Sequence, residues 1–272
     1  MQLLKSSVHV PTPDMANGKA ILLLHEFKGS AESLKYLAKT FCASGFFVFA
    51  PLYEGHGCDT TEDFQKTHWI DWFNSAEIAY LSLLGGLQGL PKFAHKDVSI
   101  VGYEMGAHFA IQLDIKYGVD RTVLISPNLK VKNYWRHMTP ILRHFIKYDV
   151  NPLYKPEETK KGMFVDALDR MIYKSNIWFQ KEFEFTKVIK MTKSYLAKHN
   201  PSWDNPENRH VCQIVTTPTD RVGLKIMNWL VSNFGGHKYV TRLFYSVDNI
   251  PEEAVTAPFE IMDFLRRDFS DL

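Results

Sequence analysis

The sequence predicts an α/β protein in which an open, mostly parallel, doubly wound β-sheet is covered by helices on both faces. First, short apolar runs of strand length recur along the chain. Second, amphipathic segments separate most of these runs, and a helix between two strands returns the chain so that the strands run parallel. Third, 45% of the 272 residues are apolar, which is enough to bury a large core.

The first half of the chain alternates between strand and helix. Gly45 ends the first amphipathic segment, and Pro51 ends the strand that follows it. In chain order, we expect strands at 20–24, 47–50, 98–101 and 122–125, and helices at 34–42, 69–84 and 105–117.

The second half resumes this alternation only after a long interruption. Between 127 and about 209 there is no strand signal, and the apolar spacing indicates helices near 164–172 and 185–196. We therefore expect a core formed by 1–127 and 210–272 and an inserted helical cap formed by 128–209. The large aromatic side chains of the cap either pack it onto the sheet or roof an apolar pocket. After the cap, we expect strands at 211–215 and 239–244, a helix around 226–231 between them, and a final helix at about 253–267.

Composition excludes several classes of protein. Lys plus Arg number 32 against 30 Asp plus Glu, a net charge of +2, so we expect neither nucleic acid nor an anionic membrane as a partner. Cys42, Cys58 and Cys212 lack the paired spacing of a zinc site or a disulfide framework. The apolar runs are too short to span a bilayer, and we expect a soluble, cytoplasmic protein. The oligomeric state stays open.

The loops that follow the first three predicted strands carry the polar residues of interest. Ligands of parallel α/β sheets bind at the carboxyl ends of the strands, where such loops gather. The three loops span 25–30, 51–57 and 102–107, and the third runs directly into a helix.

These loops carry motifs that resemble the α/β-hydrolase superfamily, and specifically its bacterial carboxylesterases and monoacylglycerol lipases. The resemblance implies an α/β-hydrolase fold with a helical cap before the triad acid, and a nucleophile on a sharp turn in the motif GxSxG. The matching segments occur in the family's order: ILLLHEF at 21–27, APLYEGHG at 50–57, GYEMG at 102–106, and a late strand that leads to Asp220.

The sequence departs from this family at the residues that perform the chemistry. The resemblance places Glu104 at the position of the nucleophilic serine and Asp248 at the position of the triad histidine. Glu26 stands where the family has the glycine of the oxyanion loop, and Asp220 alone matches the triad. The sequence contains no histidine after His237. Serine hydrolysis needs a hydroxyl and an imidazole, so we expect this activity to be lost.

Gly102 and Gly106 still satisfy the steric demand of the turn, which we expect to be intact. Glu104 then precedes a helix, and we expect its carboxylate to accept hydrogen bonds from the oxyanion-hole donors, by resemblance the backbone N–H groups of Phe27 and Met105. Of the nearby histidines, we expect His25 and His56 to hold loops, and His108 to be buried packing. Each of these three therefore has a structural interpretation.

Three interpretations of the whole site remain open. The first is a pseudoenzyme that binds a small apolar, acyl or aromatic molecule, or that regulates a partner, with no cofactor and no metal. The second is an active hydrolase of an ester or alkyl substrate. It would use an unrecognised nucleophile, or Glu104, whose extra methylene shifts the attacking oxygen by about 1.5 Å relative to Asp. The third is a divalent cation site, because we expect the four acids to converge on one region. Those acids are Glu26, Glu104, Asp220 and Asp248.

Overall fold

The computed structural model describes residues 6–57, 61–127, 134–146, 148–150, 176–198, 211–216, 240–244 and 257–267. The strands are β1 (Ser7–His9), β2 (Ala20–Leu24), β3 (Phe47–Ala50), β4 (Val98–Tyr103), β5 (Arg121–Ile125), β6 (Tyr148–Val150), β7 (Asn176–Trp178), β8 (Val211–Thr216) and β9 (Val240–Phe244). The α-helices are α1 (Lys35–Ala43), α2 (Thr61–Lys66), α3 (Trp69–Gly85), α4 (Met105–Tyr117), α5 (Tyr134–Leu142), α7 (Phe179–Lys198) and α9 (Ala257–Arg266).

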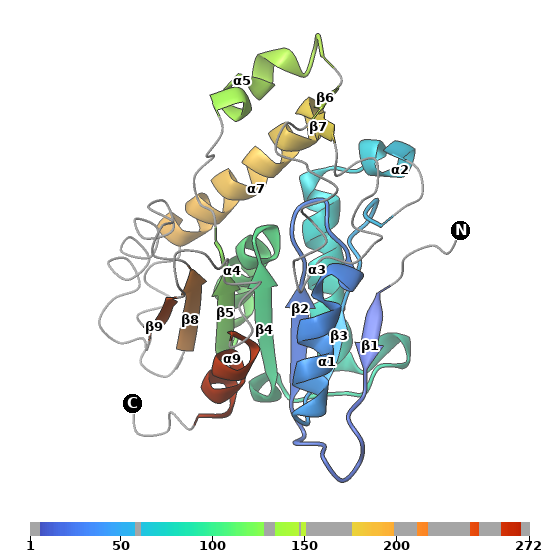
Figure 1. The fold of residues 1–272 in the computed structure, drawn as a ribbon, viewed down its shortest axis with the longest axis vertical. Coiled ribbons are helices and arrows are strands. Elements are labelled where there is room, and N and C mark those ends of the chain that lie inside the picture. Colours follow the sequence, from blue (N-terminus) through green and yellow to red (C-terminus); the bar gives the residue numbers. More distant parts are fainter. Residues whose placement is uncertain are drawn as a thin grey trace.

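The main sheet has the order β1-β3-β2-β4-β5-β8-β9 and forms the centre of the molecule (Figure 1). All neighbouring strands run parallel except β1, which pairs antiparallel with β3 at one edge. The central position of β2 and β4 brings the loops that follow them side by side. The predicted fold class is confirmed, and the six predicted strands all form with small shifts at their ends.

Alternate residues of β2 and β3 enter two separate hydrophobic cores. In β2, Leu22 and Leu24 face the core that contains α3, α4 and α7, while Ile21 and Leu23 face the core that contains α1 and α9. This period of two is the geometry of a sheet buried on both faces. Figure 1 shows the same layering, with α1 and α9 in front of the sheet and α3 and α4 behind it.

The region between β5 and β8 differs from the sequence prediction. The expectation of no strand there was wrong, because β6 and β7 form a short antiparallel pair. Each has only three residues, which is too short for a recognisable period. The predicted helix at 185–196 is confirmed inside the longer α7, and α5 was not predicted. The predicted helices near 164–172 and 226–231 lie outside the described residues, and the division into core and cap stays a prediction.

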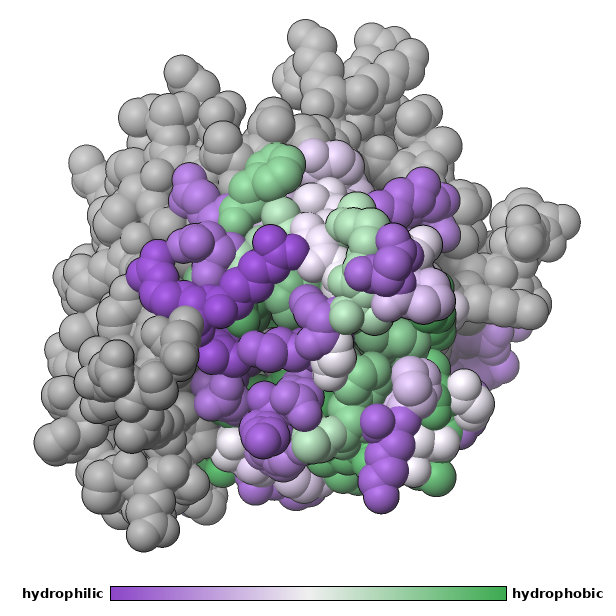
Figure 2. Space-filling model, turned by 90° about the horizontal axis from the view of Figure 1, so that it is seen from below, coloured by the Kyte–Doolittle hydropathy of each residue, from purple (hydrophilic) through white to green (hydrophobic). Residues whose placement is uncertain are grey.

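The two ends of the molecule differ. Helices α5 and α7 lie at the upper end in Figure 1, where β2 and β4 end. Seen from the opposite end, hydrophilic side chains gather over the middle of the described surface and hydrophobic ones lie beside them (Figure 2). A mixed surface of this kind is ordinary for the outside of a protein. None of the described helices combines the length and apolar character needed to cross a membrane.

Candidate functional site

A sharp turn joins β4 to α4, and Glu104 stands at its centre. Glu104 has φ 48° and ψ −102°, a backbone conformation that a residue with a side chain rarely adopts. The flanking glycines explain why the turn closes. A Cβ added to Gly106 would lie 2.2 Å from the backbone oxygen of Leu24, and one added to Gly102 would lie 2.3 Å from the backbone oxygen of Gly106. The predicted turn is therefore present, and its glycines are sterically required.

The Glu104 carboxylate is hydrogen-bonded to the loop that follows β2. The backbone N–H of Phe27 donates to Glu104 Oε2 at 3.3 Å. The expected contact from Phe27 is thus present, and Met105, whose N–H was the second expected donor, is completely buried at the start of α4. The resemblance makes the Phe27 N–H an oxyanion-hole donor. In this protein the donor is hydrogen-bonded to the carboxylate of Glu104.

Glu26 lies in the same loop, but its carboxylate folds back over the loop itself. The hydroxyl of Ser33 donates to Glu26 Oε2 at 2.8 Å. A Cβ added to Gly29 would lie 2.2 Å from the carboxyl carbon of Glu26, so Gly29 leaves the space that this carboxylate fills. Glu26 is half-buried and orders the loop that carries Phe27.

The other two predicted acids cannot be placed. Asp220 and Asp248 lie outside the described residues, and their convergence with Glu104 stays a prediction. Within the described segments, no group of three or more His, Cys, Asp and Glu side chains is arranged to hold a metal ion. A cation site would therefore need Asp220, Asp248 or another residue from the remaining segments.

The two buried histidines of the loops have structural partners. The His25 ring stacks on Tyr53 with centroids 3.9 Å apart, and its Nδ1 donates to the backbone oxygen of Glu26 at 2.9 Å. His56 Nδ1 lies 3.3 Å from the backbone oxygen of Glu54. Burial lowers the pKa of His56 well below its ordinary value, and the proximity of His25 lowers this pKa further. Both side chains thus support the loops around the turn, as the sequence predicted.

Under α7, the hydroxyl of Thr192 lies beside the imidazole of His108, so this pair has to be considered as a nucleophile and its base. Thr192 Oγ1 is 3.2 Å from His108 Nδ1. The same hydroxyl donates to the backbone oxygen of Val188 at 3.0 Å and accepts a hydrogen bond from Gln112 Nε2 at 2.8 Å. Thr192 and His108 are both completely buried, so no substrate can reach this pair. It joins α4 to α7, which agrees with the predicted packing role of His108.

A second such pair, between Tyr80 and His95, lies near the start of β4. Tyr80 OH is 3.1 Å from His95 Nε2. Burial raises the pKa of Tyr80, and the nearby carboxyl of Asp114 raises this pKa further. A phenol whose proton is held this tightly is a poor nucleophile.

Aromatic rings connect the oxyanion loop to α7. The Phe27 ring stacks on Phe185 of α7 with centroids 4.9 Å apart, and it also packs against Trp72 and Phe64. Phe185 is completely buried, and Trp178 and Phe179 are nearly so. For these three side chains, the structure favours the interpretation that they pack the inserted region onto the core.

Buried charged residues of α7 were missed by the sequence analysis. Lys28 Nζ lies 3.3 Å from Glu182 Oε1. Lys181 donates to the backbone oxygen of Thr67, and Glu184 accepts from the backbone N–H of Trp69 at 3.2 Å. The spacing of Lys181 could have predicted its burial. Lys181 precedes Phe185 by four residues and so lies on the apolar face of the helix.

Comparisons with known proteins find an esterase and a lipase among the sequence relatives of this chain. A carboxylesterase of Bacillus subtilis (strain 168) is 24% identical over 161 residues, covering 57% of this chain and 61% of the relative. A thermostable monoacylglycerol lipase of Bacillus sp. (strain H-257) is 30% identical over 93 residues, which is 34% of each protein. The chain thus spans less than two thirds of the length of these relatives.

Solved structures establish the fold over nearly the whole chain. A structure described under two metagenome-derived lipolytic enzymes, LipS and LipT, superposes with a TM-score of 0.71 and 15% identity, and the alignment covers 98% of this chain and 100% of the other. The protein therefore has the α/β-hydrolase fold of esterases and lipases. The sequence pattern of the dienelactone hydrolase family matches residues 7–160, which is more than half of the chain. The chain belongs to the dienelactone hydrolase family.

Proposed function

We propose that this member of the family has lost serine-hydrolase chemistry and acts as a pseudoenzyme that binds a small apolar, acyl or aromatic molecule. The observation that carries the proposal is the position of Glu104. It stands on an intact turn, and its carboxylate accepts the Phe27 N–H at 3.3 Å.

Two physical consequences of Glu104 support the loss of activity. A carboxylate at the turn supplies no hydroxyl that a base could activate. In addition, an oxyanion-hole donor stabilises the negative oxygen that develops in the transition state. The Glu104 carboxylate uses such a donor in the resting protein, and its charge repels a second negative oxygen at the same place. The site therefore favours binding of an uncharged ligand over acyl transfer.

The experiment that tests this proposal is hydrolysis of 4-nitrophenyl acetate, butyrate and octanoate by the purified protein. We expect the wild-type protein and the variant Glu104→Ala to hydrolyse these esters at the same background rate. Glu62→Ala removes an exposed acid from α2 and serves as the matched control. Wild-type hydrolysis that disappears in Glu104→Ala and persists in Glu62→Ala would overturn the proposal.

A second candidate function, hydrolysis through Glu104 as a carboxylate nucleophile, is favoured by the strained backbone of the turn. A positive φ of 48° at a residue with a side chain is retained where the surrounding structure enforces it, and such strain clusters at functional sites. An attacking carboxylate would form an ester with an alkyl substrate and release the halide or open the epoxide.

Mass spectrometry of the intact protein distinguishes the two functions. After incubation with alkyl halides and epoxides, a carboxylate nucleophile would add the mass of the alkyl group at Glu104. We expect no such gain, and the variant Glu104→Gln gives the reference spectrum. A mass increase that peptide mapping places on Glu104 would instead establish the second function.

A further inference from the structure

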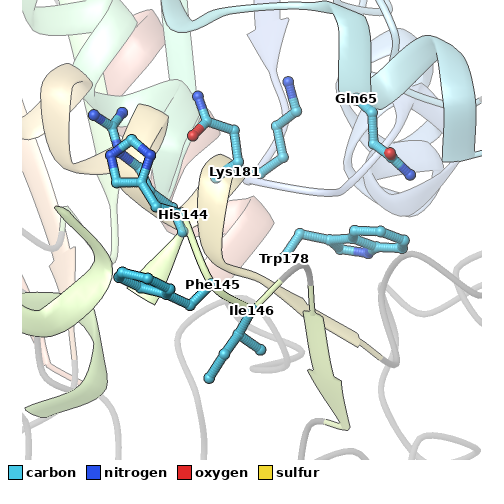
Figure 3. Close-up of a pocket in the computed structure, with 8 residues that line it drawn as sticks. Gln65, His144, Phe145, Ile146, Trp178 and Lys181 are labelled. Atoms are coloured by element: carbon cyan, nitrogen blue, oxygen red, sulfur yellow. The ribbon is translucent and has the colours of Figure 1, made fainter. Parts of the chain in front are cut away.

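A cavity of about 290 Å³ lies away from Glu104, between α2, the turn that follows α5, and the junction of β7 with α7 (Figure 3). Trp178 and Lys181 are its buried lining residues, and His144 and Phe145 lie across from Gln65 in Figure 3. The volume is at the lower end of the range for small-molecule sites. It suits a ligand with one ring.

The charge of the lining is positive. Arg143, His144 and Lys181 line the cavity, and the described lining residues include no Asp or Glu. The ammonium group of Lys181 donates a hydrogen bond to the backbone oxygen of Thr67. His144 Nε2 accepts a hydrogen bond from Arg143 Nε at 3.2 Å. One other cation of the lining has a planar group that suits a carboxylate.

That cation is Arg143. Its guanidinium carbon lies 3.8 Å from the centroid of the Phe183 ring, which holds the planar group in place. Among the described residues, no carboxylate lies within ion-pair distance of Arg143, and its terminal Nη groups make no hydrogen bond. A fixed guanidinium with free N–H groups matches the two oxygens of a carboxylate.

The remaining walls are apolar. Trp178 is only 5% exposed and forms part of the cavity wall, whereas Phe145 is 82% exposed at the rim, next to Ile146. A ligand that covers an exposed Phe removes apolar surface from water, which favours binding. The lining thus combines the Arg143 guanidinium with apolar side chains.

We propose that this cavity binds a small aromatic carboxylate, with the carboxylate on the Arg143 guanidinium and the ring against Phe145. A monoanion fits better than a phosphate dianion because one guanidinium neutralises one charge. This site is independent of the loss of hydrolysis at Glu104, since Glu104 does not line the cavity.

The test is isothermal titration of the full chain with benzoate, with benzamide as the uncharged ligand of matched shape. We expect benzoate to bind more tightly than benzamide. Arg143→Gln should weaken benzoate binding by about 10-fold to 100-fold, because a charge-assisted pair is lost. Lys190→Gln removes an exposed cation from α7 and should leave the affinity for benzoate unchanged. Arg143→Lys keeps the charge but not the planar group, and we expect an intermediate loss.

Several results would overturn the proposal. These are absence of heat with wild-type protein at millimolar benzoate, equal affinities for benzoate and benzamide, and equal affinities of the wild-type and Arg143→Gln proteins. Tighter binding of phenyl phosphate than of benzoate would reject the assignment to a monoanion. A loss of benzoate binding in Glu104→Gln would place the ligand at the turn instead. Unfolding midpoints of each variant separate loss of binding from loss of fold.

Discussion

Glu104 changes the chemistry of the site without changing the backbone that presents it. Gly102 and Gly106 leave the space that the turn needs, and the Phe27 N–H faces the side chain that the turn carries. In a serine hydrolase the same position would present a hydroxyl. Here the carboxylate is held by a donor that the family resemblance assigns to the oxyanion hole. The turn of a hydrolase is therefore present, with a carboxylate at the position of its nucleophile.

We predict that Gly106→Ala destabilises the protein strongly. The added Cβ would lie 2.2 Å from the backbone oxygen of Leu24, and a backbone atom of a central strand cannot move aside cheaply. We expect the free energy of unfolding to fall by about 2 kcal/mol or more. Denaturant unfolding followed by circular dichroism measures this change.

The matched control is Gly85→Ala at the end of α3. Its added Cβ would meet the side chain of Leu87 at 3.1 Å, and Leu87 is exposed and free to turn aside. We expect a change within about 0.5 kcal/mol. Equal effects of the two substitutions would contradict the steric account of the turn.

At the scale of single residues, the sequence predicted the positions at which the backbone allows only glycine. It did not predict the hydrogen-bond partners of individual side chains. The role of the glycines around Glu104 follows from steric rules that hold for any such turn. The direction of Glu26 does not, because its carboxylate turns toward Ser33 in a loop whose path depends on Gly29. Asp220 and Asp248 stay predictions.

At the scale of elements, α7 is held to the core by buried charged groups as well as by aromatic rings. Glu182 pairs with Lys28 of the oxyanion loop, and Glu184 accepts the N–H of Trp69 at the start of α3. Lys181 contacts the backbone of Thr67 between α2 and α3. Helix α7 thus orders both segments that surround the turn.

We predict that Glu182→Gln destabilises the fold by about 3 kcal/mol, because it leaves the charge of Lys28 buried without its carboxylate. The side chains of Lys28 and Glu182 are only 9% and 5% exposed. The double variant Lys28→Met with Glu182→Leu should recover most of the loss, since it removes both charges. Denaturant unfolding of the wild-type protein, Lys28→Met, Glu182→Leu and the double variant gives the coupling energy.

The control for this cycle is the pair of Lys35 and Glu32, whose side chains are 45% and 25% exposed. We expect removal of Lys35 to change stability by less than about 1 kcal/mol. A coupling energy no larger for the buried pair than for this exposed pair would contradict the role of Lys28 and Glu182.

We also predict a pH dependence from Lys181. Burial lowers its pKa to about 8, while Glu184 and Asp71 act in the opposite direction and Lys187 lowers it further. Between pH 8 and the ordinary lysine pKa of 10.5, the unfolded chain binds the proton and the folded chain does not. Stability from this group therefore rises with pH across that window and is lost as pH falls through 8.

The comparison with Lys181→Met isolates this contribution. We expect the stability of wild-type protein relative to Lys181→Met to increase by about 1 to 3 kcal/mol from pH 7.5 to pH 10.5. Chemical unfolding at several pH values measures it. A difference that stays constant or falls across this range would show that Lys181 is not desolvated in the folded protein.

The elements themselves were predictable to unequal degrees. Strands β2 to β5 follow from apolar runs that are buried on both faces, and α3 and α4 follow from their apolar faces. Strands β6 and β7 could not be predicted in this way, because each forms a strand only by pairing with the other, which lies far away in the sequence. Strand β1 was missed for the same reason, since its three residues form a strand only against β3.

At the scale of the whole molecule, the order of the strands places the site. Loops from β2 and β4 meet because these strands are neighbours at the centre of the sheet, and α7 covers that end (Figure 1). The parallel arrangement was predictable from the alternation of strand and helix. The resemblance supplied the α/β-hydrolase superfamily, and the match over residues 7–160 supplied the dienelactone hydrolase family.

The most direct measurement of the central claim is ester hydrolysis by Glu104→Ser alone and by the double variant Glu104→Ser with Asp248→His. We predict that the single variant stays at the background rate, because the resemblance places Asp248 where the imidazole that takes the proton of the hydroxyl would stand. The double variant should exceed it by about 100-fold. Activity in the single variant, or activity of the wild-type protein that depends on Glu104, would contradict the account.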